Sequence, residues 1–221
     1  MPVKKQYGPL LTILAIWIGI AAYGNGQAGD DVLDYYWRKA AETFERRRNA
    51  DDALRYRLET RSFYKSLDRK GRVARVDTAN VAYFFSGPNL DSAVFGRGDP
   101  ARFELVELIP PDIFTISYKK NLFPNDDGVG ELAIGLDTEG EAAEVPSGLL
   151  LLDRRSYLPR LLYLYYEPEG DLVRLTRSFR FFEFNGLIVP DSAWVSASKR
   201  GVFFTEHFRI ETAVTDFSML P

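Results

Sequence analysis

Apolar and polar residues alternate along most of the second half of the chain, which predicts long β-strands. Residues 161–166 are apolar in both alternating rows, so this strand is expected to be covered on both faces. Residues 172–184 and 187–197 follow, separated by an Asn-Gly dipeptide at 185–186 that is typical of a type I′ hairpin. Residues 202–217 form the last alternating run. The pattern therefore predicts an antiparallel meander of four long strands.

One clear helical period of apolar residues occurs in the chain, at residues 30–48. Acidic residues begin this stretch and arginines end it, which suits the helix macrodipole. Its apolar positions recur three and four residues apart on one broad face that includes Trp37 and Phe44. Such an amphipathic helix must be covered by another element. Trp37 and Phe44 fit a packed core better than direct ligand contact, and both roles stay open.

Shorter patterns fill the middle of the chain. Residues 53–65 alternate strictly between a polar and an apolar row, and a turn at 68–71 leads to a return strand at 72–85. Glycine-rich residues 86–100 predict a long loop. The remaining predicted strands cover residues 102–108, 113–118, 131–137 and 148–153.

The turns of the second half resemble those of a known family. Leu158-Pro159, a Gly170-x-Leu172 turn, and the Asn-Gly dipeptide followed by Pro190 occur in that order between strands. In this order the last third of the chain resembles LolA-like outer-membrane lipoprotein-sorting proteins. The resemblance implies an α+β fold: an incomplete antiparallel β-barrel (half-barrel) with an N-terminal amphipathic helix on its concave side. It also implies a lipid-binding cavity and an arginine that holds a lid shut, for which Arg97 is the nearest and a poorly matched counterpart.

The N-terminus predicts export. Lys4 and Lys5 precede an apolar run at residues 10–22, and small residues follow up to Ala28, which together make the three parts of a secretory signal peptide. We expect cleavage near Ala28, with an uncleaved anchor as the alternative. A single half-barrel domain would then span residues 29–221 in the periplasm. The chain has no cysteine, so neither a disulfide framework nor a lipid-modified cysteine is expected.

The charge of the chain argues against nucleic acid as a partner. The formal net charge is -3, and loss of Lys4 and Lys5 with the signal peptide would take it from -3 to -5. A mildly acidic chain without a basic block is not typical of proteins that bind nucleic acid.

Residues that could carry catalysis are few. The single histidine, His207, lies in a mostly polar strand row, which predicts an exposed side chain. The sequence contains no Gly-x-Ser-x-Gly elbow, phosphate-binding glycine loop or dinucleotide fingerprint, and no His and acid spacing that predicts a metal site. We therefore expect a protein that is not an enzyme and uses no cofactor or metal. A hydrolase, the less favoured alternative, would need two buried acids with raised pKa values in a cleft.

Aromatic residues are the strongest remaining signal, at 14% of the chain. An open barrel lined by such side chains would hold an apolar ligand, whereas a closed one would be filled by them. We expect a carrier of lipid acyl chains or of a lipidated protein, in transient contact with a membrane-associated partner. The alternative is an interaction or sensing module that recognises a protein through strand edges or the glycine-rich loop. The residues expected to bind the ligand are Trp37, Phe44, Tyr83, Phe85, Tyr163 and Tyr165.

Overall fold

The computed structural model describes residues 27–48, 54–87, 89–123, 130–138, 145–184, 187–202 and 204–221. Residues 1–26 of the expected signal peptide and the expected Asn-Gly turn lie outside these ranges. Within them the chain forms one long helix and ten strands. No helix in these ranges is long and apolar enough to cross a membrane.

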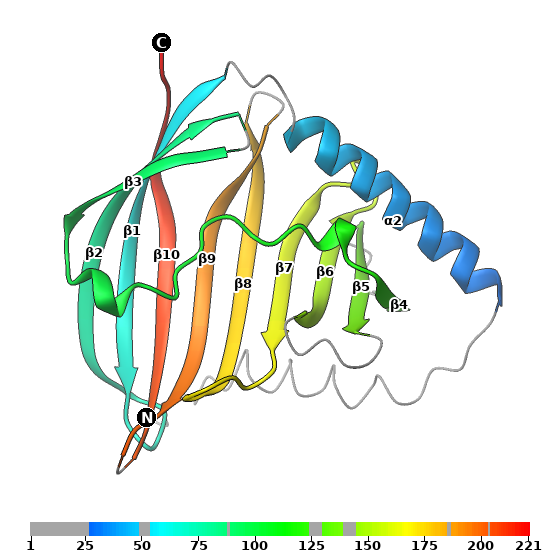
Figure 1. Cartoon of the computed structure of the whole chain (residues 1–221). Coiled ribbons are helices and arrows are strands. Elements are labelled where there is room, and N and C mark those ends of the chain that lie inside the picture. The colour runs from blue at the N-terminus through cyan, green and yellow to red at the C-terminus, as the bar shows by residue number, and fades with distance from the viewer. Residues whose placement is uncertain are drawn as a thin grey trace, which may run out of the picture.

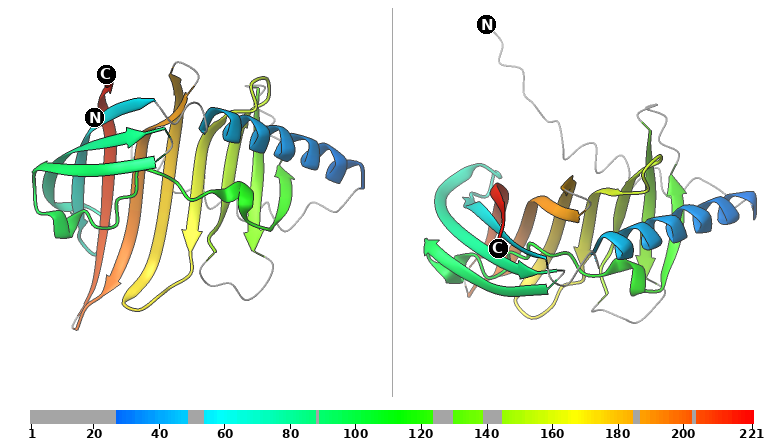
Figure 2. Two further views of the ribbon diagram at one scale, coloured as in Figure 1. Left: turned by 45° about the horizontal axis from the view of Figure 1, so that its top comes forward. Right: turned by 90° about the horizontal axis from the view of Figure 1, so that it is seen from above.

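All ten strands belong to one antiparallel sheet with the order β3-β2-β1-β10-β9-β8-β7-β6-β5-β4. β3 and β4 form its two edges, so the sheet curves without closing (Figures 1 and 2). This confirms the expected fold class, an α+β half-barrel with an N-terminal helix. In chain order the strands are β1 (Arg55–Leu67), β2 (Val73–Ser86), β3 (Asn89–Arg97), β4 (Tyr118–Phe123), β5 (Glu131–Thr138), β6 (Ser147–Asp153), β7 (Pro159–Tyr166), β8 (Leu172–Phe184), β9 (Leu187–Arg200) and β10 (Thr205–Met219).

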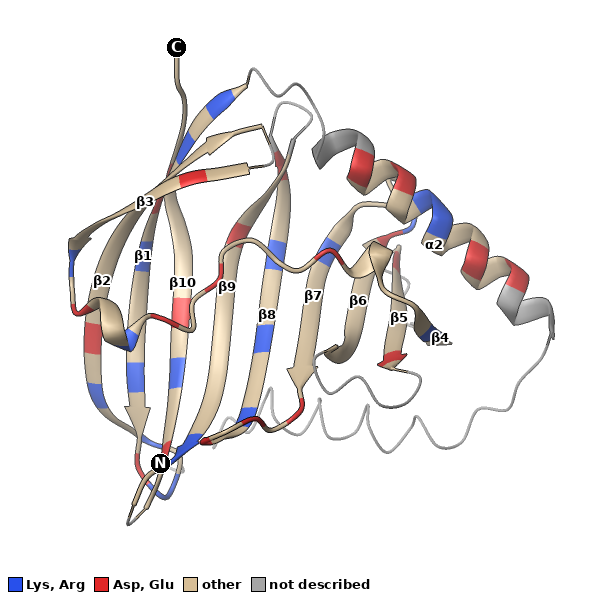
Figure 3. Ribbon diagram, viewed as in Figure 1, with Lys and Arg blue, Asp and Glu red and all other residues tan. Residues whose placement is uncertain are grey.

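Helix α2 (Gln27–Arg48) lies across the concave side of the sheet, toward the β4 edge (Figure 1). Its residues Leu33 and Ala40 are buried, in agreement with the apolar face expected from the sequence. Charged residues recur along the exposed length of the helix (Figure 3). The helix therefore buries one face on the sheet and leaves the other in water, as an amphipathic helix should.

Residues 98–117, which we call the strap, lead from β3 at one edge of the sheet to β4 at the other. The strap crosses the concave side on its way (Figure 1). Its regular structure is limited to two short 3₁₀ helices, Pro100–Arg102 and Ile113–Thr115. Together, α2 and the strap cover the concave face of the half-barrel.

The structure contradicts three sequence predictions in this middle region. Residues 86–100 are not a long loop, because they contain β3, whose side chains are all exposed and so give no alternating burial pattern. The predicted strand at residues 102–108 lies in the strap, and the one at 113–118 lies in the strap up to residue 117. Single side chains such as Phe103, Leu108 and Ile113 point inward from irregular backbone there, which imitates part of a strand pattern.

The last strand begins later than its apolar pattern predicts. Val202 and Phe204 lie in the turn before β10, where they are 91% and 65% exposed. The rest of the alternation is correct, since Phe208 and Ile210 are buried. A tight turn after Arg200 takes the first residues of the apolar row out of the sheet.

Candidate functional site

The concave face under α2 is an aromatic and aliphatic cluster. Leu33 and Ala40 of the helix pack with buried residues of β5, β6 and β7, among them Leu164. The ring of Trp37 lies 4.9 Å from that of Phe114 in the strap, and the Phe44 ring lies 5.3 Å from the same Phe114 ring. Helix and strap therefore contact each other through aromatic rings as well as contacting the sheet.

A second cluster lies at the other end of the concave face. Phe85 of β2 stacks on Tyr56 of β1 with ring centroids 4.7 Å apart. Leu108 of the strap belongs to the same buried cluster. Tyr83 contacts the edge of the same cluster. Burial raises the pKa of Tyr56 to about 12 and also raises the pKa of Tyr83. These phenols are therefore neutral hydrogen-bonding groups in an apolar surrounding.

The six residues expected to bind ligand are divided between two faces of the sheet. Trp37 and Phe44 lie in the cluster under α2, and Tyr83 and Phe85 in the cluster at the β2 end, all on the concave side. The alternate residues of β7, Leu162 and Leu164, face this side, so Tyr163 and Tyr165 point to the convex side. The two tyrosines therefore cannot share a concave ligand site with the other four residues.

Sequence reasoning missed Arg177, the charged residue at the centre of the concave side. It lies on β8 between Leu175 and Phe179, in the row that faces inward, and its side chain is 12% exposed. A guanidinium Nη1 lies 2.9 Å from Oε1 of Glu107 in the strap. The guanidinium carbon also lies 5.0 Å from the centre of the Tyr166 ring. The sequence shows an arginine in one of two alternating rows of this strand, and its pattern does not say which row faces inward.

Arg177 is not fully satisfied by these contacts. Its Nε is buried and has no hydrogen-bond partner among the residues that the structure describes. Burial raises the pKa of Tyr166 while the neighbouring guanidinium lowers it. A buried donor without an acceptor is costly, so the site is suited to receive an acceptor from another molecule.

A second charged contact holds the other half of the strap. Arg102 pairs with Asp77 of β2 and lies 5.7 Å above the ring of Tyr64. The Tyr64 hydroxyl in turn donates to Glu206 of β10 at 2.8 Å. Phe103, next to Arg102, is buried against Tyr64. The strap is thus fixed at this point by one ion pair and one buried ring.

Backbone hydrogen bonds do not attach the strap to the sheet. Among described residues, its backbone–backbone bonds join strap residues to each other, such as Phe103 N–H to Pro100 O at 2.9 Å and Val106 N–H to Phe103 O at 3.0 Å. The strap is therefore held on the concave face by side chains alone. A segment of this kind can leave the sheet without breaking a strand ladder.

The described residues do not form a catalytic or metal site of a familiar kind. His207 is exposed as expected; its Nδ1 lies 2.7 Å from the Ser198 hydroxyl, and no carboxylate among the described residues contacts it to complete a triad. No cluster of three or more metal-ligating side chains occurs in the part of the chain that is described. A hollow of about 450 Å³ near the β1 and β2 bulges is lined both by charged residues, Arg57, Glu59 and Arg61, and by the apolar residues Val81, Ala82 and Val94.

The chain is an open half-barrel whose concave face is covered by a helix and by a strap that side chains hold in place. No protein-family model matches the chain, and no curated protein matches it either. Two solved structures are similar to it, each with a TM-score of 0.36. One is a LolA superfamily protein from Nitrosomonas europaea (12% identity, 83% of this chain and 94% of that one). The other is an outer membrane lipoprotein-sorting protein domain from Vibrio parahaemolyticus (10% identity, 83% and 93%).

Both similar structures are named for the family that the sequence resembles. The fold described above rests on the register and order of this chain's own strands.

Proposed function

We propose that this protein is a non-catalytic carrier that binds lipid acyl chains or a lipidated protein on the concave face of its half-barrel. The observation that carries the proposal is the strap, which covers apolar residues from one sheet edge to the other and has no backbone bond to them. Moving it would uncover the apolar clusters on the concave side of the sheet. The proposed place of action is the periplasm, after export by the N-terminal segment.

The free energies of apolar burial are similar in size for the strap and for a lipid chain. Phe103, Leu108 and Ile113 are its buried anchors, and burying three such side chains stabilises the closed state by about 6 kcal/mol. An acyl chain of about 16 carbons gains roughly 12 kcal/mol when fully buried, at about 0.8 kcal/mol per methylene. Partly buried strap residues such as Phe114 and Leu105 and the ion pair of Arg102 with Asp77 add to the closed state, so a single acyl chain offsets a large part of the strap's contacts.

Arg177 gives this surface a polar anchor. Once Glu107 moves away with the strap, the guanidinium becomes a cation in an otherwise apolar face with several free donors. A carboxylate or phosphate at the head of a lipid would take the place of the Glu107 carboxylate. The proposed ligand is therefore an anionic amphiphile, bound with its head at Arg177.

A reversible cross-link tests the proposal directly. The chain contains no cysteine, so Arg102→Cys in the strap together with its contact Asp77→Cys in β2 supplies the only two thiols for a bismaleimide linker with a cleavable disulfide, and Arg177 stays in place. We expect uptake of a fluorescent fatty acid by the open protein, loss of uptake when the linker closes, and recovery when a reductant cleaves it. Native mass spectrometry with lipid extraction reports any co-purified ligand. A protein that takes up no lipid in either state would contradict the carrier function.

A second candidate function rests on β3. This edge strand exposes Leu90, Val94 and Phe95 at 44%, 55% and 43%, and its outer backbone edge pairs with no other strand of the sheet. An extended peptide could add to such an edge, as in an interaction or sensing module. Replacing Val94 by Pro would block pairing at the edge, so loss of partner binding with unchanged lipid uptake would favour this candidate.

A further inference from the structure

The convex side of the sheet carries an ordered grid of side chains across its five middle strands. Strand register places residues of β1, β10, β9, β8 and β7 directly opposite one another in three rows. The rows are Arg61, Ala213, Ser192, Arg180 and Leu161; Phe63, Glu211, Trp194, Ser178 and Tyr163; and Lys65, Arg209, Ser196, Thr176 and Tyr165.

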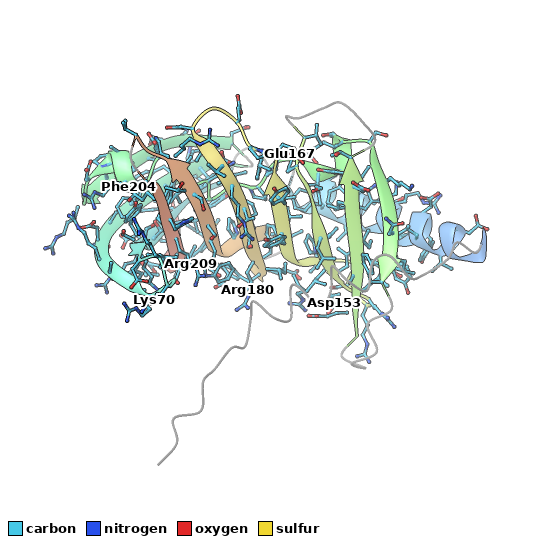
Figure 4. The ribbon with its side chains drawn as sticks, turned by 90° about the horizontal axis from the view of Figure 1, so that it is seen from below. Lys70, Asp153, Glu167, Arg180, Phe204 and Arg209 are labelled. Carbon is cyan, nitrogen blue, oxygen red and sulfur yellow. The ribbon has the colours of Figure 1, made fainter. Side chains whose placement is uncertain are left out.

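The charges in this grid are strongly one-sided. It holds four basic residues and one acidic residue, although the chain as a whole has a formal charge of -3. The one acid, Glu211, already pairs with Lys65. Arg61, Arg180 and Arg209 are exposed and form no ion pair with any residue that the structure describes. Arg180 and Arg209, labelled in Figure 4, belong to β8 and β10, which are separated by β9 in the sheet, and basic positions mark β1, β10 and β8 in Figure 3.

One pair in the grid opposes the stability of the sheet. Lys65 of β1 lies directly across from Arg209 of β10, and like charges at such positions are destabilising. The nearby Glu211 carboxylate compensates Lys65, whereas Arg209 forms no ion pair with a described residue. A sequence that keeps this conflict at the middle of a sheet face points to an anionic partner outside the chain.

Aromatic rings stand between these arginines. Trp194 of β9 is flanked by serines, and the guanidinium carbon of Arg180 lies 5.6 Å from the centre of its ring. The guanidinium carbon of Arg61 lies 5.3 Å from the centre of the Phe63 ring. Tyr163 and Tyr165 are the residues of β7 in the second and third rows of the grid. Partly exposed Trp and Tyr beside basic residues are typical of the interface between lipid headgroups and acyl chains.

We propose that this convex face docks on an anionic phospholipid bilayer, with Arg61, Arg180 and Arg209 on the headgroups and Trp194 in the interface. α2 and the strap lie on the other side of the sheet, so neither of them covers this face (Figure 2). The docking surface lies on the opposite face from the proposed lipid site and does not rest on that function. It would let the protein stand on a membrane with its concave side free.

The test is binding of the full chain to vesicles of phosphatidylcholine alone and of phosphatidylcholine with phosphatidylglycerol. We expect salt-sensitive binding to the anionic vesicles only, weakened on the order of a hundredfold by Arg61→Gln, Arg180→Gln and Arg209→Gln together. A matched control removes three exposed arginines elsewhere, with Arg69→Gln, Arg97→Gln and Arg155→Gln, and should bind within about twofold of the parent.

Trp194 reports where the protein touches the bilayer. With Trp17 and Trp37 replaced by Phe, its emission should shift to shorter wavelength on anionic vesicles and be quenched by brominated acyl chains. Equal losses in the two triple variants, or an unchanged Trp194 spectrum in bound protein, would overturn the proposal. Failure to bind vesicles of either composition would also overturn it and leave an acidic protein as the partner of this face. Lipid uptake is measured separately and tells this failure from that of the carrier function.

Discussion

Glu107 and Arg177 join the strap to the middle of the sheet through a single ion pair 2.9 Å long. The two side chains differ in their surroundings, since Arg177 is 12% exposed and Glu107 is 47% exposed. Water therefore reaches one side of the contact and weakens it. This ion pair can break when the strap moves, because the arginine stays in the sheet while the glutamate leaves with the strap.

Glu107→Gln should loosen the strap without unfolding the sheet. Replacing a half-exposed carboxylate removes about 1 kcal/mol from the closed state, which is about a fivefold rise in the open fraction. Hydrogen exchange of the strap amides should accelerate by about that factor, while exchange in β8 and β9 stays the same. Fatty-acid uptake should become faster to a similar degree.

Glu104 provides the matched control for this experiment. It lies in the same strap, is exposed, and forms no ion pair with a described residue. Glu104→Gln removes the same charge from the same segment, so its strap amides should exchange at the parent rate. Equal acceleration in both variants would show that the charge of the strap matters and the contact with Arg177 does not.

Tyr157 connects the β6–β7 turn to α2 at a cost in backbone conformation. Its φ of 58° is a left-handed value that a tyrosine rarely adopts, while its ring contacts Tyr35 and Tyr36 of the helix at 6.2 and 5.9 Å. Tyr157→Gly should remove the strain of the left-handed backbone and, at the same time, the ring contacts with α2. We expect hydrogen exchange of α2 to rise several-fold while the midpoint of thermal unfolding changes little.

Tyr157→Phe separates the ring from the hydroxyl. The hydroxyl contact with Tyr35 is long, at 3.3 Å, and exposed, so its loss should leave the exchange of α2 unchanged. Exchange that rises equally in the Phe and Gly variants would place the link in the hydroxyl contact and contradict the role of the rings.

The sequence predicts most of the strands because one face of each is buried. β1 shows this best, since its apolar row from Tyr56 to Tyr64 is the row that packs inward. β7 is the exception. Both of its rows are apolar, so alternation could not say that Leu164 faces the core and Tyr163 the convex side.

The sequence did not predict the strap or its ion pair with Arg177, and the physical reason differs from that for β7. Their contacts join residues far apart in the chain, such as Glu107 with Arg177, and depend on the path of an irregular segment. β3 was hidden because backbone bonds to β2, and not burial of side chains, define it. Of the six residues expected to bind ligand, four lie on the concave side and two on the convex side, and none of the charged contacts there was predicted from the sequence.

Adjacent residues of β7 test which row faces the core. Leu164 is fully buried, so Leu164→Ala should lower the free energy of unfolding by about 3 kcal/mol through lost contacts and a cavity. Tyr163→Ala, on the partly exposed convex side, should cost about 1 kcal/mol or less and leave fatty-acid uptake unchanged. Urea unfolding measures both variants, and a larger loss in Tyr163→Ala would reverse the assignment of the two faces.

Asp153 should make the stability of the β6–β7 turn depend on acid. Its carboxylate accepts hydrogen bonds from Ser156 N–H at 2.8 Å and from Arg155 N–H at 3.0 Å, and it pairs with Arg160 at 3.1 Å. The Ser156 backbone bond is the largest cause that lowers the pKa of Asp153 from 3.8 to about 2. Because the folded state lowers this pKa, the stabilisation is complete above pH 4 and is lost as the pH falls toward 2.

Asp153→Asn should therefore lower the free energy of unfolding at neutral pH and leave it unchanged in acid. At pH 7 we expect a loss of about 1 kcal/mol in the free energy of unfolding, allowing for solvent around the carboxylate. The curves of parent and variant should converge between pH 4 and pH 2, because the parent aspartate becomes protonated there. Asp137→Asn is the control, since Asp137 is exposed on β5 and forms no ion pair with a described residue. A difference between Asp153→Asn and the parent that stays constant down to pH 2 would show that the amide disturbs the turn for reasons other than charge.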